Sequence, residues 1–265
     1  MSHGREPHCP GIFETAPDFE AKSTDGPIHL SDYAAKGRYV LLFSYSADFN
    51  PVCSTEIIAL AKAWKRFEDM EVQLIGISID SIYSHIAWLR DLEKSAEIEI
   101  KFPIIADPEQ KIAGLYGLLH PESSNTSTVH AVFAIDPNHS IRAIQYYPQQ
   151  LGRNIEDLIR LFQGLQAIDS KHISVPADWV PGNDVIVTAP TTLADAAKRA
   201  NGGAEGAGLK VETWYLSKKE IDIKELEASK PKLIEVSSIV DTASPPKEFN
   251  NYEMETANFP INFSL

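Results

Sequence analysis

Apolar, β-prone runs alternate with amphipathic segments of helical period through the first two thirds of the chain. Residues 39–44, YVLLFS, form a compact apolar run of strand length, and residues 52–70 repeat their apolar side chains at helical spacing. A second β-rich run at 72–80 is followed by a segment, 82–92, whose apolar residues share one helical face. This alternation predicts a chain that folds by packing helices onto a sheet.

The pattern continues toward the middle of the chain. Residues 102–106 predict a third short strand, and 129–135 and 141–147 predict two more around the turn DPNHS. Residues 154–166 predict a helix whose first residue, Asn154, caps its N-terminus. The order of elements therefore predicts an α/β fold with a mostly open sheet and helices on both faces.

The composition changes near residue 168, and we divide the chain accordingly. Residues 1–168 form the predicted α/β domain, and the proline-rich and turn-rich residues 169–224 a small C-terminal domain. Within it, KRANGGAEGAG at 198–208 predicts a flexible stretch. Residues 225–265 show little periodicity and are expected to form an extended arm that packs on its own body or on another chain.

Bulk composition narrows the classes of partner. The formal net charge is −13, and no block of five or six like charges occurs, so neither nucleic acid nor anionic lipid is an expected partner. The first ten residues are not followed by an apolar signal region, and apolar runs such as 40–43 are too short to cross a bilayer. We expect a soluble, cytoplasmic protein that binds a small molecule or another protein.

Cys53 lies at the start of a predicted helix, just after Pro51. A free thiol with a pKa of about 8.5 is only slightly ionised at pH 7. The unpaired N–H groups and the positive dipole end of a helix N-terminus favour the thiolate. A small, buried, unreactive cysteine is the alternative, and position alone leaves both open.

The segment FNPVCSTE, residues 49–56, resembles the peroxiredoxin signature, in which a cysteine within a PVCTTE-like stretch attacks a peroxide. The resemblance extends over about residues 12–190. APDF at 16–19 matches the family's N-terminal strand motif. Residues 175–187 are similar to the C-terminal domain of the long one-cysteine and archaeal branch. The other matching segments are 74–88, 102–123 and 146–161.

This resemblance implies a thioredoxin-like fold, a C-terminal dimerisation domain and assembly as dimers or rings of dimers. It also implies that Cys53 reduces hydrogen peroxide or organic hydroperoxides through a sulfenic acid, which an unidentified thiol reductant then regenerates. No cofactor and no metal are implied.

The pocket departs from the family pattern at four positions, the first being Tyr45, where this branch usually has histidine. Ser46 replaces a proline that shields the thiol, so we expect a wetter thiol and a less fixed loop. Asn50 replaces a threonine and can hydrogen-bond a peroxide only in altered geometry. His130 replaces an arginine, and a largely neutral histidine activates Cys53 less. Arg153 matches a second family arginine and is expected to compensate in part.

Other candidate side chains favour simpler interpretations. Cys9 is expected to be a free surface thiol rather than a resolving cysteine, and with His3 and His8 it makes too weak a set for a metal site. His85 and His120 are expected to serve packing or hydrogen bonding.

Two functional hypotheses follow. In the first, the chain is a thiol peroxidase with Cys53 as nucleophile and with Asn50, His130 and Arg153 around it, its activity weakened by the replacements. In the second, it is a non-catalytic assembly subunit that binds a partner complex through residues 225–265.

Overall fold

The computed structural model describes residues 9–120, 122, 126–171, 173–201 and 208–221. All of these lie within one compact unit, residues 1–233. The predicted arm, residues 225–265, falls outside the described residues, as do His3 and His8.

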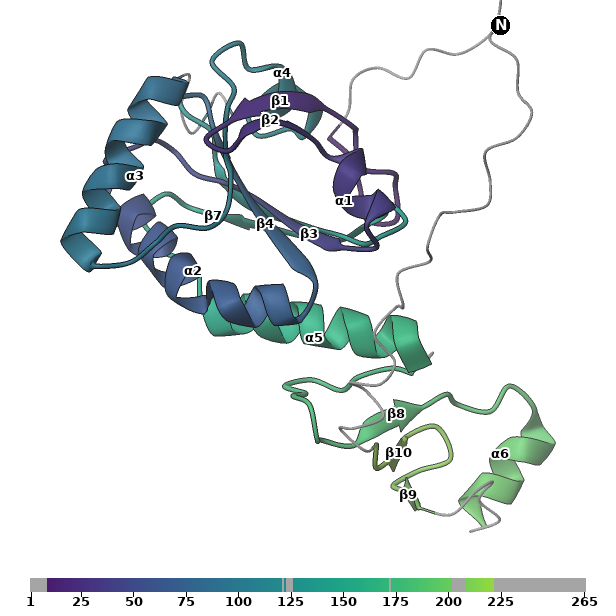
Figure 1. Ribbon diagram of the computed structural model, residues 1–265. Coiled ribbons are helices and arrows are strands. Elements are labelled where there is room, and N and C mark those ends of the chain that lie inside the picture. Colours follow the sequence, from purple (N-terminus) through teal and green to yellow (C-terminus); the bar gives the residue numbers. More distant parts are fainter. Residues whose placement is uncertain (1–8, 121, 123–125, 172, 202–207, 222–265) are drawn as a thin grey trace, which may run out of the picture. The chain divides into compact units, whose positions relative to one another are not determined.

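A seven-stranded sheet with the strand order β2-β1-β5-β4-β3-β6-β7 forms the centre of the larger domain (Figure 1). Strands β3, β4 and β5 run parallel, whereas β1, β2, β6 and β7 pair antiparallel with their neighbours. The strands are β1 (Glu20–Ser23), β2 (Gly26–His29), β3 (Tyr39–Ser44), β4 (Val72–Ser78), β5 (Ile104–Ala106), β6 (His130–Ile135) and β7 (Ile141–Tyr147).

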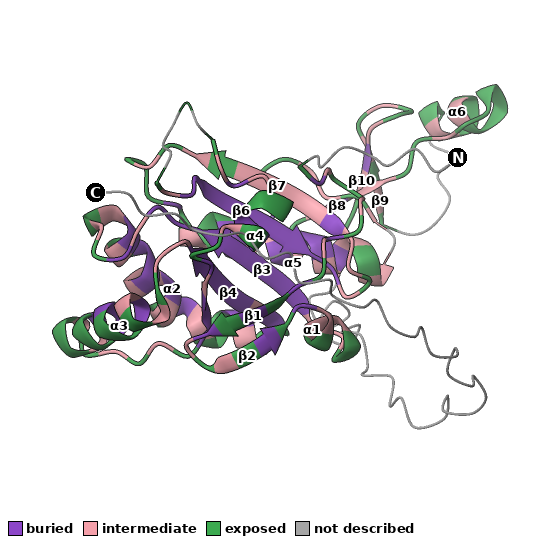
Figure 2. Ribbon diagram, turned by 90° about the horizontal axis from the view of Figure 1, so that it is seen from above, coloured by how far each residue is buried: buried purple, intermediate pink, exposed green. Residues whose placement is uncertain are grey.

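Helices cover both faces of this sheet, as the sequence predicts. Side chains of α2 (Pro51–Asp69), α3 (Ile82–Ala96) and α5 (Ile155–Lys171) pack into the core on one face. The short α1 (Ser31–Ala35) and α4 (Lys111–Leu115) lie with the other core. Figure 2 shows the buried residues concentrated along the central strands between these layers.

Strand β3 explains why YVLLFS is apolar at every position. All of its residues are buried, with Leu41 and Phe43 in one core and Val40 and Leu42 in the other. A central strand covered on both faces needs continuous rather than alternating hydrophobicity. The predicted bounds of this strand are confirmed.

Helix α5 is longer than predicted. The Asn154 side chain caps it as expected, because its Oδ1 accepts the backbone N–H groups of Glu156 at 3.0 Å and Asp157 at 3.3 Å. The helix continues to Lys171, beyond the predicted end at 166, and Ala167 in this extra turn is buried against Trp179. Packing against the C-terminal residues therefore extends the helix.

The N-terminal hairpin β1–β2 was not predicted. The APDF motif at 16–19 lies just before the first strand, which begins at Glu20, although Ala16 and Phe19 are buried in the core. Both strands are four residues long and β2 contains glycine and proline, so neither gives a clear periodic signal.

A second, three-stranded sheet of order β8-β10-β9 lies in the C-terminal part, with strands β8 (Val185–Val187), β9 (Leu209–Val211) and β10 (Ser217–Lys219). Helix α6 (Leu193–Ala200) is capped by the side chain of Thr192, the residue before it. Trp179 is buried, and its Nε1 donates to the carbonyl of Asn183 at 3.0 Å. The domain boundary near residue 168 stays a prediction.

Among the described residues, no helix has the length and apolar character needed to cross a membrane.

Phe162 provides a test of the core between α5 and the sheet. It is fully buried and makes edge-to-face contacts with Tyr39 and Phe67. We expect Phe162→Ala to lower the free energy of unfolding by about 3–5 kcal/mol, measured by urea denaturation, because it removes a large side chain and leaves a cavity. Tyr83→Ala, at a side chain that is 81% exposed, is the control and should change stability little.

Candidate functional site

The turn between β3 and α2 holds Cys53. Asn50 is the N-cap residue of α2, and its Oδ1 accepts the N–H groups of Val52 at 2.9 Å and Cys53 at 3.2 Å. Pro51 occupies the first helical turn, where its missing N–H costs nothing. Asn–Pro thus fixes the start of the helix, and Cys53 lies in its first turn as predicted.

Two polar side chains contact the thiol. Cys53 Sγ lies 3.4 Å from Ser46 Oγ and 3.5 Å from His130 Nε2. The Ser46 Oγ and His130 Nε2 atoms are themselves 3.3 Å apart. His130 begins β6, which pairs with β3, so the sheet brings it beside the start of α2. All three side chains are buried.

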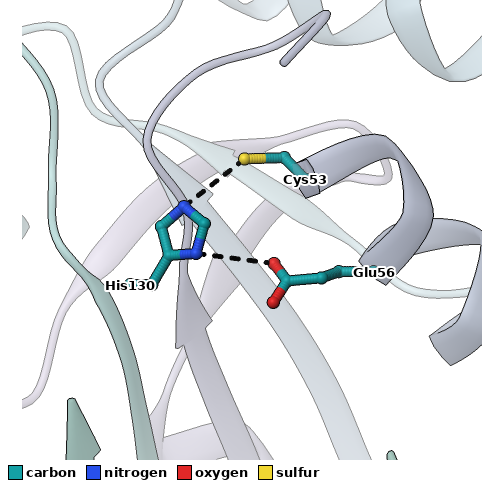
Figure 3. Close-up of side chains that lie close together, drawn as sticks. All are labelled: Cys53, Glu56 and His130. Carbon is teal, nitrogen blue, oxygen red and sulfur yellow. Dashed lines mark hydrogen bonds and ion pairs between the residues drawn. The ribbon is translucent and has the colours of Figure 1, made fainter. Parts of the chain in front are cut away.

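His130 lies between Cys53 and Glu56 and presents a different ring nitrogen to each (Figure 3). Glu56 is three residues beyond Cys53 on the same face of α2, and its Oε2 lies 3.8 Å from His130 Nδ1. This Nδ1 is buried and has no hydrogen-bond partner among the residues that the structure describes.

Burial is the main influence on His130. It lowers the pKa of the imidazole below its usual value, Glu56 acts in the opposite direction, and the charge of Arg153 lowers the pKa further. The ring is therefore neutral at pH 7, in agreement with the expectation from the sequence.

Arg153 contacts Glu56 and the backbone. Its backbone N and Nε each donate to Glu56 Oε1 at 2.8 Å, and Nη2 donates to Oε2 at 2.5 Å. Nη1 donates to the carbonyls of Ser44 at 3.0 Å and Ala131 at 3.1 Å. None of the hydrogen bonds found for Arg153 in the described part of the chain reaches Cys53, so this arginine positions Glu56.

The expectation of a wetter thiol and a looser loop is wrong. Cys53 has no exposed surface and Ser46 only 4%, because Ser46 packs directly against the sulfur. The loop is also anchored, since Asp48 accepts a hydrogen bond from the hydroxyl of Tyr45 at 2.9 Å and lies 2.9 Å from His85 Nδ1. Burial and the negative charge of Asp48 raise the pKa of Tyr45, so its hydroxyl stays a donor.

The remaining candidates lie elsewhere. The second ring nitrogen of His85, Nε2, donates to the carbonyl of Ile105 at 3.1 Å, so this histidine serves hydrogen bonding as expected. The ring of His120 lies 5.6 Å from that of Tyr146 in a tilted arrangement, and Cys9 is an exposed thiol 3.2 Å from the hydroxyl of the same Tyr146. Tyr146 pairs with Ala131 and faces the opposite side of the sheet from His130.

Cys53, Glu56 and His130 together form a buried group whose potential metal-ligand atoms lie within 4.8 Å of one another, which the sequence did not predict. Two features disfavour a chelate. The histidine faces the thiol and the carboxylate with opposite nitrogens, and both carboxylate oxygens already accept hydrogen bonds from Arg153. The geometry suits proton transfer better than metal binding.

A thiol at the N-terminus of a helix that follows an inner strand of a mixed sheet is typical of a thioredoxin-like protein with a cysteine site, and solved structures agree. The chain is similar to a yeast mitochondrial 1-Cys peroxiredoxin, with 34% identity, a TM-score of 0.70, and coverage of 80% of this chain and 100% of that one. It is also similar to a cysteine-to-serine mutant of peroxiredoxin 6 from Arenicola marina, with 29% identity, a TM-score of 0.68, and coverage of 80% and 98%.

Sequence comparisons identify the family. The AhpC/TSA family profile matches residues 12–144, and the profile for the C-terminal domain of 1-Cys peroxiredoxin matches residues 164–203. A peroxiredoxin of Aquifex aeolicus is 46% identical over 222 residues, which cover 80% of this chain and 97% of that protein. The chain belongs to the peroxiredoxin family, and the predicted thioredoxin-like fold with a C-terminal domain is confirmed.

Sequence reasoning did not predict two contacts. The sequence pattern shows Ser46 only as a replacement for proline, whereas its hydroxyl, seven residues before the cysteine, reaches the thiol across the turn. The approach of His130 to Glu56 was also missed, and the spacing of Glu56 from Cys53 on one helical face was the available signal.

Arg153→Met tests the buried ion pair. We expect a loss of about 3–5 kcal/mol in the free energy of unfolding, measured by urea denaturation, because Glu56 is left charged and unpaired in the interior. Arg66 of α2 pairs with Glu156 of α5, but both side chains are more than half exposed. Arg66→Met is the matched control and should cost far less. Equal losses in the two variants would contradict the assignment of the buried pair as the stabilising one.

Proposed function

We propose that this chain is a thiol peroxidase in which Cys53 reduces hydrogen peroxide or a small organic hydroperoxide. The observation that carries the proposal is the position of the Cys53 thiol at the N-terminus of α2, in contact with both Ser46 and His130. The peroxiredoxin relatives support the same chemistry.

The reaction is a two-electron transfer at sulfur. The sulfur attacks the terminal peroxide oxygen, an S–O bond forms as the O–O bond breaks, and Cys53 becomes a sulfenic acid. The dipole at the helix N-terminus favours the anionic sulfur that attacks. Because Cys53 has no exposed surface, the substrate is a small molecule admitted by local opening of the loop 45–50.

Asn50 and Arg153 act in different ways in this proposal. The helix cap uses only the oxygen of the Asn50 side chain, and among the described residues no partner is found for its NH₂ group, which we assign as a donor to a peroxide oxygen. Arg153 holds Glu56 in place. His130 stands where the family has a charged arginine, and loss of one such donor typically lowers the rate about a hundredfold to a thousandfold. The proposed enzyme is therefore slower than arginine-containing relatives.

A separate thiol returns the sulfenic acid to the reduced state. The yeast relative is described as resolved through the glutathione and thioredoxin systems, and we assign a reductant of this class. Cys9 does not fit the resolving role, because its contact Tyr146 faces the other side of the sheet. A homodimer or ring of dimers and a cytoplasmic location belong to the same proposal.

Cys53→Ser tests the nucleophile. Reduced protein would be mixed with limiting hydrogen peroxide and followed by stopped-flow tryptophan fluorescence, since Trp88 donates to Ser54, the neighbour of Cys53. We expect the unaltered protein to react at least about a hundredfold faster than free cysteine and to gain one oxygen atom in the intact mass. Cys53→Ser should abolish both signals.

Cys9→Ser is the control, because it removes the other cysteine and leaves the pocket unchanged. Its rate should equal that of the unaltered protein. Oxidation of the unaltered protein no faster than free cysteine would refute the proposed activity.

A further inference from the structure

We propose that His130 is the proton acceptor for the Cys53 thiol and that the Arg153–Glu56 pair positions it, so that a buried Cys–His–Glu relay activates the sulfur. This inference rests on the proposed peroxidase function and specifies how its nucleophile is activated. The residues come from distant parts of the sequence, and Figure 3 shows the imidazole between the sulfur and the carboxylate.

The first step of the argument concerns the tautomer of His130. Its Nδ1 faces the carboxylate of Glu56, which accepts hydrogen bonds but donates none. A proton on Nδ1 therefore gains a favourable interaction, and the same Nδ1 has no other partner in the described structure. A neutral ring protonated at Nδ1 leaves Nε2 unprotonated, and Nε2 is the atom 3.5 Å from Cys53 Sγ.

The second step concerns the position of the carboxylate. Both oxygens of Glu56 accept hydrogen bonds from Arg153, whose Nη1 is itself held by two backbone carbonyls. This arrangement resembles the third member of a nucleophile–base–carboxylate triad, which orients the base without accepting its proton.

The third step concerns the charges around the ring. Cys53 and Glu56 face it from α2 and Arg153 from the segment before α5. Tyr147 is its cross-strand partner on β7, and burial raises the pKa of that phenol, so it stays neutral. Since burial also lowers the pKa of His130, the imidazole can accept a proton at neutral pH.

The proton and electron balance follows from this arrangement. As the sulfur attacks the hydroperoxide, the thiol proton moves to His130 Nε2, and two electrons from sulfur break the O–O bond. The terminal oxygen stays on sulfur with its own hydrogen. The imidazolium then returns its proton to the departing alkoxide or hydroxide, so thiol and hydroperoxide become sulfenic acid and alcohol or water.

Cys–His–carboxylate groups also serve acyl transfer, but in the described part of the chain the helix N-terminus offers no free pair of N–H groups for an oxyanion. The N–H groups of Val52 and Cys53 would be the donors there, and both bond the side chain of Asn50. Attack of the Cys53 sulfur on a peroxide oxygen needs no such pair of donors, so this reaction fits the site better than acyl transfer.

The test compares His130→Gln with the unaltered residue, both in a Cys9→Ser background, so that Cys53 is the only thiol. Second-order rates with hydrogen peroxide and with methyl methanethiosulfonate would be measured between pH 6 and 8. His120→Gln is the matched control, since the ring of this histidine packs beside Tyr146, on the other face of the sheet.

With His130 present, we expect both rates to be nearly independent of pH above the lowered pKa of the imidazole and to fall below it. His130→Gln should instead make both rates rise about tenfold per pH unit over this range, because without the base only the ionised thiol reacts. At pH 7 the variant should be slower by about a hundredfold or more. His120→Gln should keep the flat profile.

A tenfold rise per pH unit in the protein that retains His130 would overturn the inference, even if His130→Gln failed to fold. The methanethiosulfonate profile separates this outcome from failure of the proposed function. A flat profile with that reagent but no fast peroxide reaction would support the relay and refute the peroxidase. Fast oxidation by peroxide, with rates that rise steeply with pH both in the protein that retains His130 and in His130→Gln, would support the peroxidase and refute the relay.

Discussion

The buried ion pair between Arg153 and Glu56 is the interaction on which the site depends. The Arg153 guanidinium donates hydrogen bonds to the Glu56 carboxylate on α2. It also donates to the backbone carbonyls of Ser44, at the end of β3, and Ala131, near the start of β6. Three elements that surround the thiol are thus fixed to one side chain. Two charges taken out of water are costly, and only a nearly complete set of charge-assisted hydrogen bonds offsets that cost. The pair therefore acts as a framework that sets where Glu56, and through it His130, can lie.

The pocket around Cys53 differs in kind from one built on a charged arginine. A guanidinium lowers the pKa of a thiol through its permanent charge, whereas a buried, neutral imidazole can only accept the proton during reaction. Ser46 closes the pocket in the place of a proline, and its hydroxyl contacts both the sulfur and the imidazole. Two replacements that individually look like losses, Ser46 and His130, are mutually consistent in three dimensions, since they contact each other.

Much of the fold could be predicted from periodicity. The strands at 39–44 and 141–147 match their predicted bounds because one is buried on both faces and the other follows a distinct turn. The β1–β2 hairpin was missed because its four-residue strands carry no repeating pattern. Helix α5 extends beyond its predicted end because Ala167 packs against Trp179, a contact that no local pattern records.

The sequence by itself determined the family and the position of Cys53 in the first turn of a helix, because the Asn50 cap and Pro51 act within a few residues of the thiol. Only the tertiary structure decided what surrounds that thiol. His130 is 77 residues from Cys53, and Arg153 is 97 residues from Glu56. Strand pairing and buried hydrogen bonds bring these residues together, and they depend on the packing of the whole sheet rather than on any local preference.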